Sequence, residues 1–402
     1  MPSNFEEMHI DELDLQGKVA LVRVDFNVPL KDGVVGDRNR IIAAVPTIEK
    51  LLDSGAKVVL MSHLGRPKGE VKAEFSLSQI VSAVSEELGR EVAFVDQCVG
   101  QEVKEAIANL KENGVLLLEN LRFHAEEEKG DRAFASQLAE LGDVYVNDAF
   151  GTAHRAHAST AIIADFFKAD ERAFGYLIQN ELEAVARLLQ EPQRPFTAIM
   201  GGAKISDKIL LIENILDKVD RLIIGGGMSY TFFKAKGGDV GNSLVEEDKL
   251  QLALDLLNKA EEKGVELHLP QDSIIADNFS NDANTSEADN MQIKSGWMGL
   301  DIGSKASREF AEVVESSKTI LWNGPMGVFE MSKFAEGTKA MATAIANATE
   351  NGAFSLIGGG DSAAAIRTFN FDDKVSYIST GGGALLEYLE GKELPGIKAI
   401  QS

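Results

Sequence analysis

Residues 354–367 read FSLIGGGDSAAAIR: a short apolar run, three glycines and the start of an alanine-rich segment. This order predicts a buried strand, a turn and a helix that begins near Asp361 and Ser362. Such a turn is typical of phosphate binding, because glycines allow close approach and the N–H groups of a helix start favour negative charge. A carboxylate at Asp361 would then suggest a bridging Mg²⁺, which prefers oxygen ligands. Alternatively, the glycines form an ordinary turn and Asp361 or Ser362 only caps the helix.

The same alternation of short apolar runs and amphipathic segments extends along the whole chain. In the first half it predicts strands at residues 19–24, 57–61, 92–95, 115–118 and 144–146, and helices at 40–54, 77–88, 102–110 and 133–141. In the second half it predicts strands at residues 197–200, 221–224, 265–269, 319–321, 354–357 and 375–378. Strands separated by helices indicate βαβ units and mostly parallel sheets. The polar segment 277–290 is expected to be an exposed loop.

The length of 402 residues exceeds what one ordinary core supports, so two domains are expected. We predict an α/β protein with two Rossmann-like, three-layer domains, mostly parallel sheets and a cleft between them. An amphipathic helix at 180–190, followed by Pro192, is the expected connector. The predicted boundaries are 1–178 for the first domain, 179–191 for the connecting helix and 192–389 for the second domain.

Composition excludes several classes of partner and compartment. The net charge of -23 argues against nucleic acid and anionic membranes as main partners. One cysteine, Cys98, excludes an intrachain disulfide and fits a reducing compartment. The first 14 residues carry five acidic side chains and lack the apolar segment of a secretory signal. Because no apolar run reaches membrane-spanning length, a cytoplasmic protein is expected.

The predicted strand ends differ between the two halves, and ligands of open α/β sheets bind at these ends. In the first half the ends are basic, with Arg23, Arg66, Arg122, Arg155, His63 and His154. Arginines gathered against a negative background predict an anion pocket, because the guanidinium group binds two oxygens at once.

In the second half five strand ends are glycine-rich, at residues 201–202, 225–227, 324, 358–360 and 381–383. These turns predict a flat backbone surface for a nucleotide and its phosphates, with Gly202, Ala203, Gly226, Gly227 and Asn323 among its residues. Lys204 and Lys208 are four residues apart, so on a helix that opens after Gly202 they would share one face and could hold phosphates.

Several familiar catalytic motifs are absent from the sequence. It has no Walker A motif, protein-kinase catalytic loop or Gly-x-Ser-x-Gly elbow. The six histidines show no zinc spacing. An anion pocket, a nucleotide surface and two lysines together fit phosphoryl transfer, in which a protein mainly positions groups and neutralises charge. The alternatives are a nicotinamide-dependent dehydrogenase, for which the acidic residue about 20 positions after the glycines is missing, and a two-lobed anion-binding protein.

The chain resembles the phosphoglycerate kinase family over nearly its full length. The resemblance is carried by RVDFNVP (23–29), SHLGRP (62–67), ENLRF (119–123), DAFGTAHRAH (148–157), GGAKISDK (201–208), GGGM (225–228), WNGPMGVFE (322–330), GGGDS (358–362) and GGGA (381–384). It implies reversible transfer between ATP and 3-phosphoglycerate, giving ADP and 1,3-bisphosphoglycerate, with Mg²⁺ bound to the nucleotide. It also implies that residues 390–402 pack back on the first domain, and a monomer is expected.

The resemblance also assigns roles to individual residues. The implied phosphoglycerate ligands are Asp25, Asn27, Arg40, His63, Arg66, Arg122 and Arg155. Arg40 and Lys208 are the implied catalytic residues, whereas Arg38, two positions before Arg40, is interpreted as a surface residue. The implied nucleotide ligands are Lys204, Lys208, Glu330, Gly359, Gly360, Asp361 and Ser362, with Asp361 also the metal ligand and Glu330 on the ribose.

Overall fold

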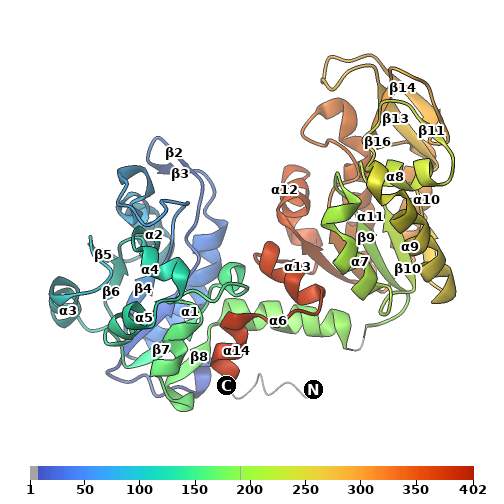
Figure 1. The fold of residues 1–402 in the computed structure, drawn as a ribbon. Helices are drawn as coiled ribbons and strands as arrows, with labels where there is room; N and C mark the ends of the chain where they lie inside the picture. Colours follow the sequence, from blue (N-terminus) through green and yellow to red (C-terminus); the bar gives the residue numbers. More distant parts are fainter. Residues whose placement is uncertain (1–7, 191) are drawn as a thin grey trace. The chain divides into compact units, whose positions relative to one another are not determined.

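The computed structural model describes residues 8–190 and 192–402. The chain divides into two compact units: unit 1 is Met1–Glu183 with Lys392–Ser402, and unit 2 is Ala184–Gly391. Each unit has a six-stranded parallel sheet flanked by helices, which confirms the predicted α/β class (Figure 1). None of the described helices combines the length and the apolar character that a membrane crossing requires.

Unit 1 contains the sheet β5-β6-β4-β1-β7-β8, in which all neighbouring strands are parallel. Its strands are β1 (Val19–Arg23), β4 (Lys57–Met61), β5 (Val92–Val95), β6 (Val115–Leu118), β7 (Val144–Asn147) and β8 (Arg172–Phe174). Its helices are α1 (Asn39–Asp53), α2 (Val81–Leu88), α3 (Gln101–Ala108), α4 (Ala125–Lys129), α5 (Arg132–Ala139) and α14 (Pro395–Gln401). The last helix belongs to unit 1, where Gly396 N donates to Ala153 O at 2.8 Å.

Burial explains why the strands of unit 1 are mostly apolar. All four residues of β6 are buried, as expected for a parallel strand that is covered on both faces. One core contains Val22 of β1 and Leu60 of β4, together with Ile48 of α1 and Val84 of α2. The carboxyl ends of β1, β4, β6 and β7 therefore lie along one edge of a rigid sheet.

Unit 2 repeats this design with the parallel sheet β12-β10-β9-β17-β18-β19. Its strands are β9 (Phe196–Met200), β10 (Arg221–Ile224), β12 (Glu266–His268), β17 (Thr319–Asn323), β18 (Phe354–Gly358) and β19 (Tyr377–Ile378). Its helices are α7 (Ile209–Ile215), α8 (Ser229–Ala235), α9 (Leu250–Glu262), α10 (Ser304–Glu315), α11 (Glu336–Glu350), α12 (Gly360–Thr368) and α13 (Gly383–Leu389). Trp322 of β17 packs in one core with Phe310 of α10 and Ile345 of α11.

Unit 2 also carries a small antiparallel sheet that the sequence did not predict. It has the order β14-β13-β16, formed by β13 (Asp272–Ala276), β14 (Thr285–Asp289) and β16 (Met298–Ile302). The prediction of a loop over 277–290 is therefore wrong for β14. This edge strand is exposed along most of its length, so it lacks the alternation of apolar and polar residues that marks a half-buried strand.

Helix α6 (Tyr176–Leu189) begins four residues before the predicted start at 180. Its first backbone N–H groups bond to distant side chains: Tyr176 N donates to Thr47 Oγ1 and Leu177 N to Asp148 Oδ1, both at 2.9 Å. Asp148 is fully buried at the end of β7. The helix start was missed because its caps lie far away in the sequence, where no local signal indicates them.

Candidate functional site

Arg23, at the carboxyl end of β1, is fully buried and forms the base of a cationic cluster. Its Nε donates to Ser159 Oγ at 2.8 Å, and its Nη2 contacts His63 Nδ1 at 3.3 Å. Because an arginine can only donate, His63 Nδ1 must accept, which leaves a proton on Nε2. Burial and the charge of Arg23 hold the pKa of His63 well below its usual value. His63 is therefore a neutral hydrogen-bond donor at neutral pH.

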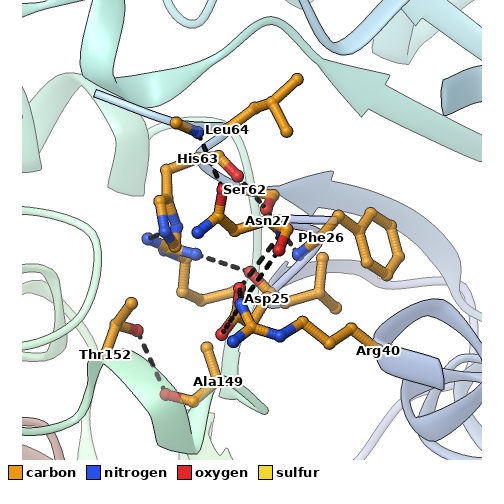
Figure 2. Close-up of polar contacts among 12 residues, drawn as sticks. Asp25, Phe26, Asn27, Arg40, Ser62, His63, Leu64, Ala149 and Thr152 are labelled. Atoms are coloured by element: carbon orange, nitrogen blue, oxygen red, sulfur yellow. Dashed lines mark hydrogen bonds and ion pairs between the residues drawn. The ribbon is translucent and has the colours of Figure 1, made fainter. Parts of the chain in front are cut away.

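Arg40 lies in the first turn of α1 and reaches the loop that follows β1 (Figure 2). Its Nη1 lies 3.0 and 3.1 Å from the two carboxylate oxygens of Asp25 and 3.1 Å from Asn27 O. The side-chain oxygen of Asn27 accepts a 2.8 Å bond from Gly65 N, which ties this loop to the loop after β4. Asp25, Asn27 and Arg40 are thus held together by one network, while the His63 side chain is bound to Arg23.

Further cations adjoin this network. Arg122 donates to Gly65 O at 3.1 Å, and burial together with the nearby charge of Arg23 lowers its pKa. Burial, Arg122 and Arg23 lower the pKa of His157 to about 4, and Arg155 also contributes. Besides burial, the neighbouring arginines contribute to both lowered pKa values, as expected where positive charges are gathered.

Arg66 and Arg155 are the exposed members of the predicted set. Across residues 8–190 and 192–402, the side chain of Arg66 makes no hydrogen bond or ion pair, so the structure does not tie it to the network. Among the residues that the structure describes, Arg38 is not bonded to this network. Its Nη1 forms ion pairs with Glu86 at 2.7 Å and Glu87 at 3.1 Å.

Two buried residues support the cluster. The strand-end pattern predicts Arg23 as part of the anion pocket, whereas sequence reasoning missed Glu127. Glu127 is also fully buried, and its Oε1 accepts from Ser159 N at 3.0 Å and Ser159 Oγ at 2.9 Å. Burial raises the pKa of Glu127. It stands in a run of three glutamates, and nothing in that run distinguishes it from its exposed neighbours.

Unit 2 contains a cavity of about 490 Å³ whose walls include many of the predicted nucleotide residues. These are Gly202, Ala203, Gly226, Gly227, Glu330 and Asp361. Gly226 has φ of +71°, and a Cβ there would lie 2.5 Å from Gly202 O. This position requires glycine both for its backbone conformation and for the contact between two adjacent turns.

A further part of the cavity wall is apolar and was not predicted. Tyr230, Leu244, Phe279, Met298 and Leu300 contribute to it. Phe279 and Leu244 are 57% and 45% exposed, which is unusual for large apolar side chains beside a cavity. A cavity lined by close-packed glycines and apolar side chains suits a flat heteroaromatic ring. The exposed Phe279 within a polar segment is the signal that could have pointed to this wall.

Lys208, Asn323, Gly359, Gly360 and Ser362 are not part of the cavity wall but form a connected group beside it. Lys208 Nζ contacts Asn323 Oδ1, and Asn323 Nδ2 donates to Gly358 O at 2.8 Å. Ser362 is buried, and its Oγ accepts a 2.7 Å bond from Gly324 N. Gly359, with φ of +90°, is the N-cap of α12, and Gly360 is the first residue of this helix. Burial lowers the pKa of Lys208.

The two lysines do not share a helix face, so that prediction is wrong. Lys204 is extended, residues Ile205–Asp207 form a 3-10 turn, and α7 begins only at Ile209. The backbone N–H and the hydroxyl of Ser206 both bond to Glu246, which favours a local turn over a continuous helix. Lys204 is exposed, whereas Lys208 is half-buried.

Glu330 and Asp361 are the acidic residues among those that line the cavity, and Asp361 is the one predicted to hold a cation. Across the described residues there is no group of three or more His, Cys, Asp or Glu side chains that could hold a metal by themselves. Asp361 is exposed in the first turn of α12 and contributes to the cavity wall. One accessible carboxylate fits an Mg²⁺ ion that takes most of its other ligands from phosphates and water.

Comparisons with known proteins identify the family of the chain. Residues 10–392 match the family model described as phosphoglycerate kinase. The chain is 54% identical to the phosphoglycerate kinase of Porphyromonas gingivalis, over 98% of this chain and 100% of that protein. It is 52% identical to the phosphoglycerate kinase of Clostridium botulinum, over 99% of each chain.

Two solved structures have the same fold over 98% of both chains. The phosphoglycerate kinase of Coxiella burnetii matches with a TM-score of 0.88 and 42% identity. The phosphoglycerate kinase of Pyrococcus horikoshii matches with a TM-score of 0.83 and 31% identity. The chain belongs to the phosphoglycerate kinase family.

Proposed function

We propose that this chain transfers the γ-phosphoryl group of ATP reversibly to the carboxylate of 3-phosphoglycerate, giving ADP and 1,3-bisphosphoglycerate. In this proposal residues 1–178 with 390–402 bind the phosphoglycerate, residues 192–389 bind the nucleotide and residues 179–191 connect them. One chain carries both sets of residues, so a monomer suffices. The observation that carries the proposal is that one chain has both a cationic cluster, in unit 1, and a cavity lined by glycines, in unit 2.

The cluster in unit 1 suits a small substrate with two anionic ends. Arg66, Arg122 and Arg155 supply guanidinium groups, which match phosphate and carboxylate oxygens in shape and charge. His63 supplies a neutral donor at Nε2, because Arg23 occupies its other nitrogen. Asp25 and Asn27 hold Arg40 and the loop at Gly65 in place, and they provide acceptors for a substrate hydroxyl.

The cavity in unit 2 suits the nucleoside part of ATP. Gly202, Ala203, Gly226 and Gly227 line the space for the base together with the apolar residues of the wall. Glu330 supplies a carboxylate for the ribose hydroxyls. The backbone N–H groups at Gly359, Gly360 and Ser362 bind phosphate oxygens at the start of α12, aided by Lys204, Lys208 and Asn323. Asp361 would hold Mg²⁺, which supplies charge neutralisation on the phosphates when bound.

The transfer itself requires no general base. The carboxylate oxygen of 3-phosphoglycerate is already ionised and forms the new O–P bond, while the bond from the γ-phosphorus to the bridging oxygen breaks and ADP leaves. Arg40 and Lys208 offset the charge on the moving group, and such contributions dominate catalysis of phosphoryl transfer. Arg40 is bound to Asp25 and therefore exchanges this partner for the phosphoryl oxygens.

A turnover assay with ATP, Mg²⁺ and 3-phosphoglycerate tests the proposal. We expect ADP to form only when phosphoglycerate is present. Calorimetric titration with ADP and, separately, with NAD provides the comparison with a dehydrogenase. Binding of NAD in preference to ADP, or absence of turnover by a protein that binds both substrates, would contradict the proposal.

A further inference from the structure

Asp301 is a buried carboxylate directly behind the nucleotide cavity. It is 1% exposed and follows Leu300 in β16, which contributes to the cavity wall. One of its oxygens accepts a 2.8 Å bond from Gly337 N, in the first turn of α11, and the other accepts a 2.9 Å bond from Ile302 N. No role in phosphoryl transfer follows from this position, since the side chain does not contribute to the cavity wall.

Two glycines make room for this carboxylate. A Cβ at Gly327 or at Gly337 would overlap the Asp301 side chain. Neither glycine has a left-handed backbone, so conformation does not require glycine at either place. Neither position has space for a side chain, because the Asp301 carboxylate lies between the loop at Gly327 and the first turn of α11.

The loop at residues 324–330 is bonded to the two elements that Asp301 connects, α11 and β16. Its Met326 N donates to Thr338 Oγ1 at 3.1 Å, and Thr338 follows Gly337 in α11. Its Val328 N donates to Leu300 O at 2.9 Å. This loop contributes Pro325, Met326, Gly327, Val328 and Glu330 to the cavity wall. Asp301 thus fixes the helix turn to which the loop is bonded.

We propose that Asp301 is a positioning residue for nucleotide binding, which holds the start of α11 and thereby the 324–330 loop in the geometry that the nucleoside requires. This inference rests on the proposed nucleotide role of the cavity. It places Asp301 in control of nucleotide affinity and not of the chemical step.

The chain offers a matched control in Asp272. This residue is also buried, caps the start of α10 through Lys305 N and Ala306 N at 3.1 and 2.8 Å, and occupies the space where Gly303 would carry a Cβ. It therefore has the same structural role as Asp301. However, neither Asp272 nor any residue of α10 contributes to the cavity wall.

The test compares Asp301→Asn with Asp272→Asn by calorimetric titration with ADP and by steady-state kinetics. We expect Asp301→Asn to raise the Kd for ADP and the KM for ATP about tenfold, because a neutral amide is a weaker acceptor for Gly337 N than a carboxylate. Its kcat and its KM for 3-phosphoglycerate should stay within about twofold of wild type. Asp272→Asn should lose stability but keep the wild-type Kd for ADP.

Thr338→Val gives a second test that retains the buried carboxylate. It leaves Met326 N without its acceptor at nearly constant shape, so a smaller loss of ADP affinity is expected, and Thr338→Ser should restore it. Equal Kd values for Asp301→Asn and Asp272→Asn, or a fall in kcat at unchanged Kd, would overturn the inference. Failure of the wild-type protein to bind ADP would instead overturn the nucleotide assignment itself.

The pH dependence of ADP binding distinguishes a positioning role of Asp301 from a role in stability alone. Burial, and to a smaller extent Glu336 of α11, raises the pKa of Asp301 to about 7, and Tyr230 of α8 also faces it. Protonation removes acceptor capacity from the carboxylate, so wild-type Asp301 becomes similar to asparagine below this pH. The ratio of the ADP Kd of Asp301→Asn to that of wild type should therefore fall toward one between about pH 8 and pH 6. A ratio that does not change with pH would count against the inference.

Discussion

The candidate sites of the two units are built from different kinds of group. In unit 1 the positive charge lies on side chains, with Arg23 buried and Arg66 and Arg155 exposed. In unit 2 the walls are mostly glycine backbone and apolar side chains, with few charges. Side-chain sites lose function when charge is removed, whereas backbone sites lose function when volume is added. The two units should therefore respond differently to substitution.

The largest expected effect concerns Arg40, whose charge is proposed to offset that of the moving phosphoryl group. Arg40→Ala should lower kcat by about a thousandfold, because it removes the cation that we propose stabilises the transition state. Steady-state turnover with ATP and 3-phosphoglycerate measures this effect. Arg38→Ala is the control, since Arg38 pairs with Glu86 and Glu87, and it should change kcat by less than about twofold. Similar kcat values for the two variants would remove Arg40 from the mechanism.

The backbone site should fail when a methyl group is added. Gly226→Ala combines a positive φ with overlap on Gly202 O, so we expect ADP affinity to fall about a hundredfold in calorimetric titration. Gly264→Ala is the matched control because it has φ of +69° but no atom within 4 Å of the added Cβ. It should cost about 1 kcal/mol of stability and leave ADP binding unchanged. Equal ADP affinities for both variants would show that the turn at Gly226 is not part of the nucleotide site.

Burial and the neighbouring positive charges at His157 should make unit 1 sensitive to acid. The pKa of His157 is about 4 in the folded protein and about 6.5 when unfolded, so between these values the unfolded chain binds the extra proton. The free energy of unfolding should therefore fall as pH decreases from 6.5 to 4, by about 1 kcal/mol per pH unit from this residue.

His157→Gln tests this dependence by urea unfolding at several pH values. The variant should lose less stability than wild type over the same interval, and the two should differ little in slope above pH 7. Parallel curves from pH 4 to 6.5 would mean that His157 does not titrate with the lowered pKa.

The smallest expected effect concerns the overall dimensions of the protein. In-line transfer requires the two substrates to meet, so we predict that the radius of gyration decreases when a nucleotide and 3-phosphoglycerate are both bound. Small-angle scattering measures it with each ligand alone and with both. No decrease under saturation by both ligands would argue against domain closure.

Sequence patterns predicted the parallel sheets well because buried strands are continuous apolar runs, as in β6 and β18. They failed at β14, where an exposed edge strand has no such pattern, and at the start of α6, where Asp148 and Thr47 provide the caps from far away.

For the sites, glycine turns and strand-end arginines were visible in the sequence because both are local features. The prediction that Lys204 and Lys208 share a helix face failed because the bonds from Ser206 to Glu246, which favour a turn there, depend on tertiary structure. Glu127 and Asp301 were missed for the same reason, since only their burial distinguishes them from other acidic residues.

The most direct test of the division between the units is a crossed titration, in which Arg66→Ala and Gly226→Ala are each titrated with 3-phosphoglycerate and with ADP. We predict that Arg66→Ala weakens binding of 3-phosphoglycerate and retains wild-type affinity for ADP, and that Gly226→Ala shows the reverse. Loss of ADP binding by Arg66→Ala, or of 3-phosphoglycerate binding by Gly226→Ala, would contradict the assignment of one ligand to each unit.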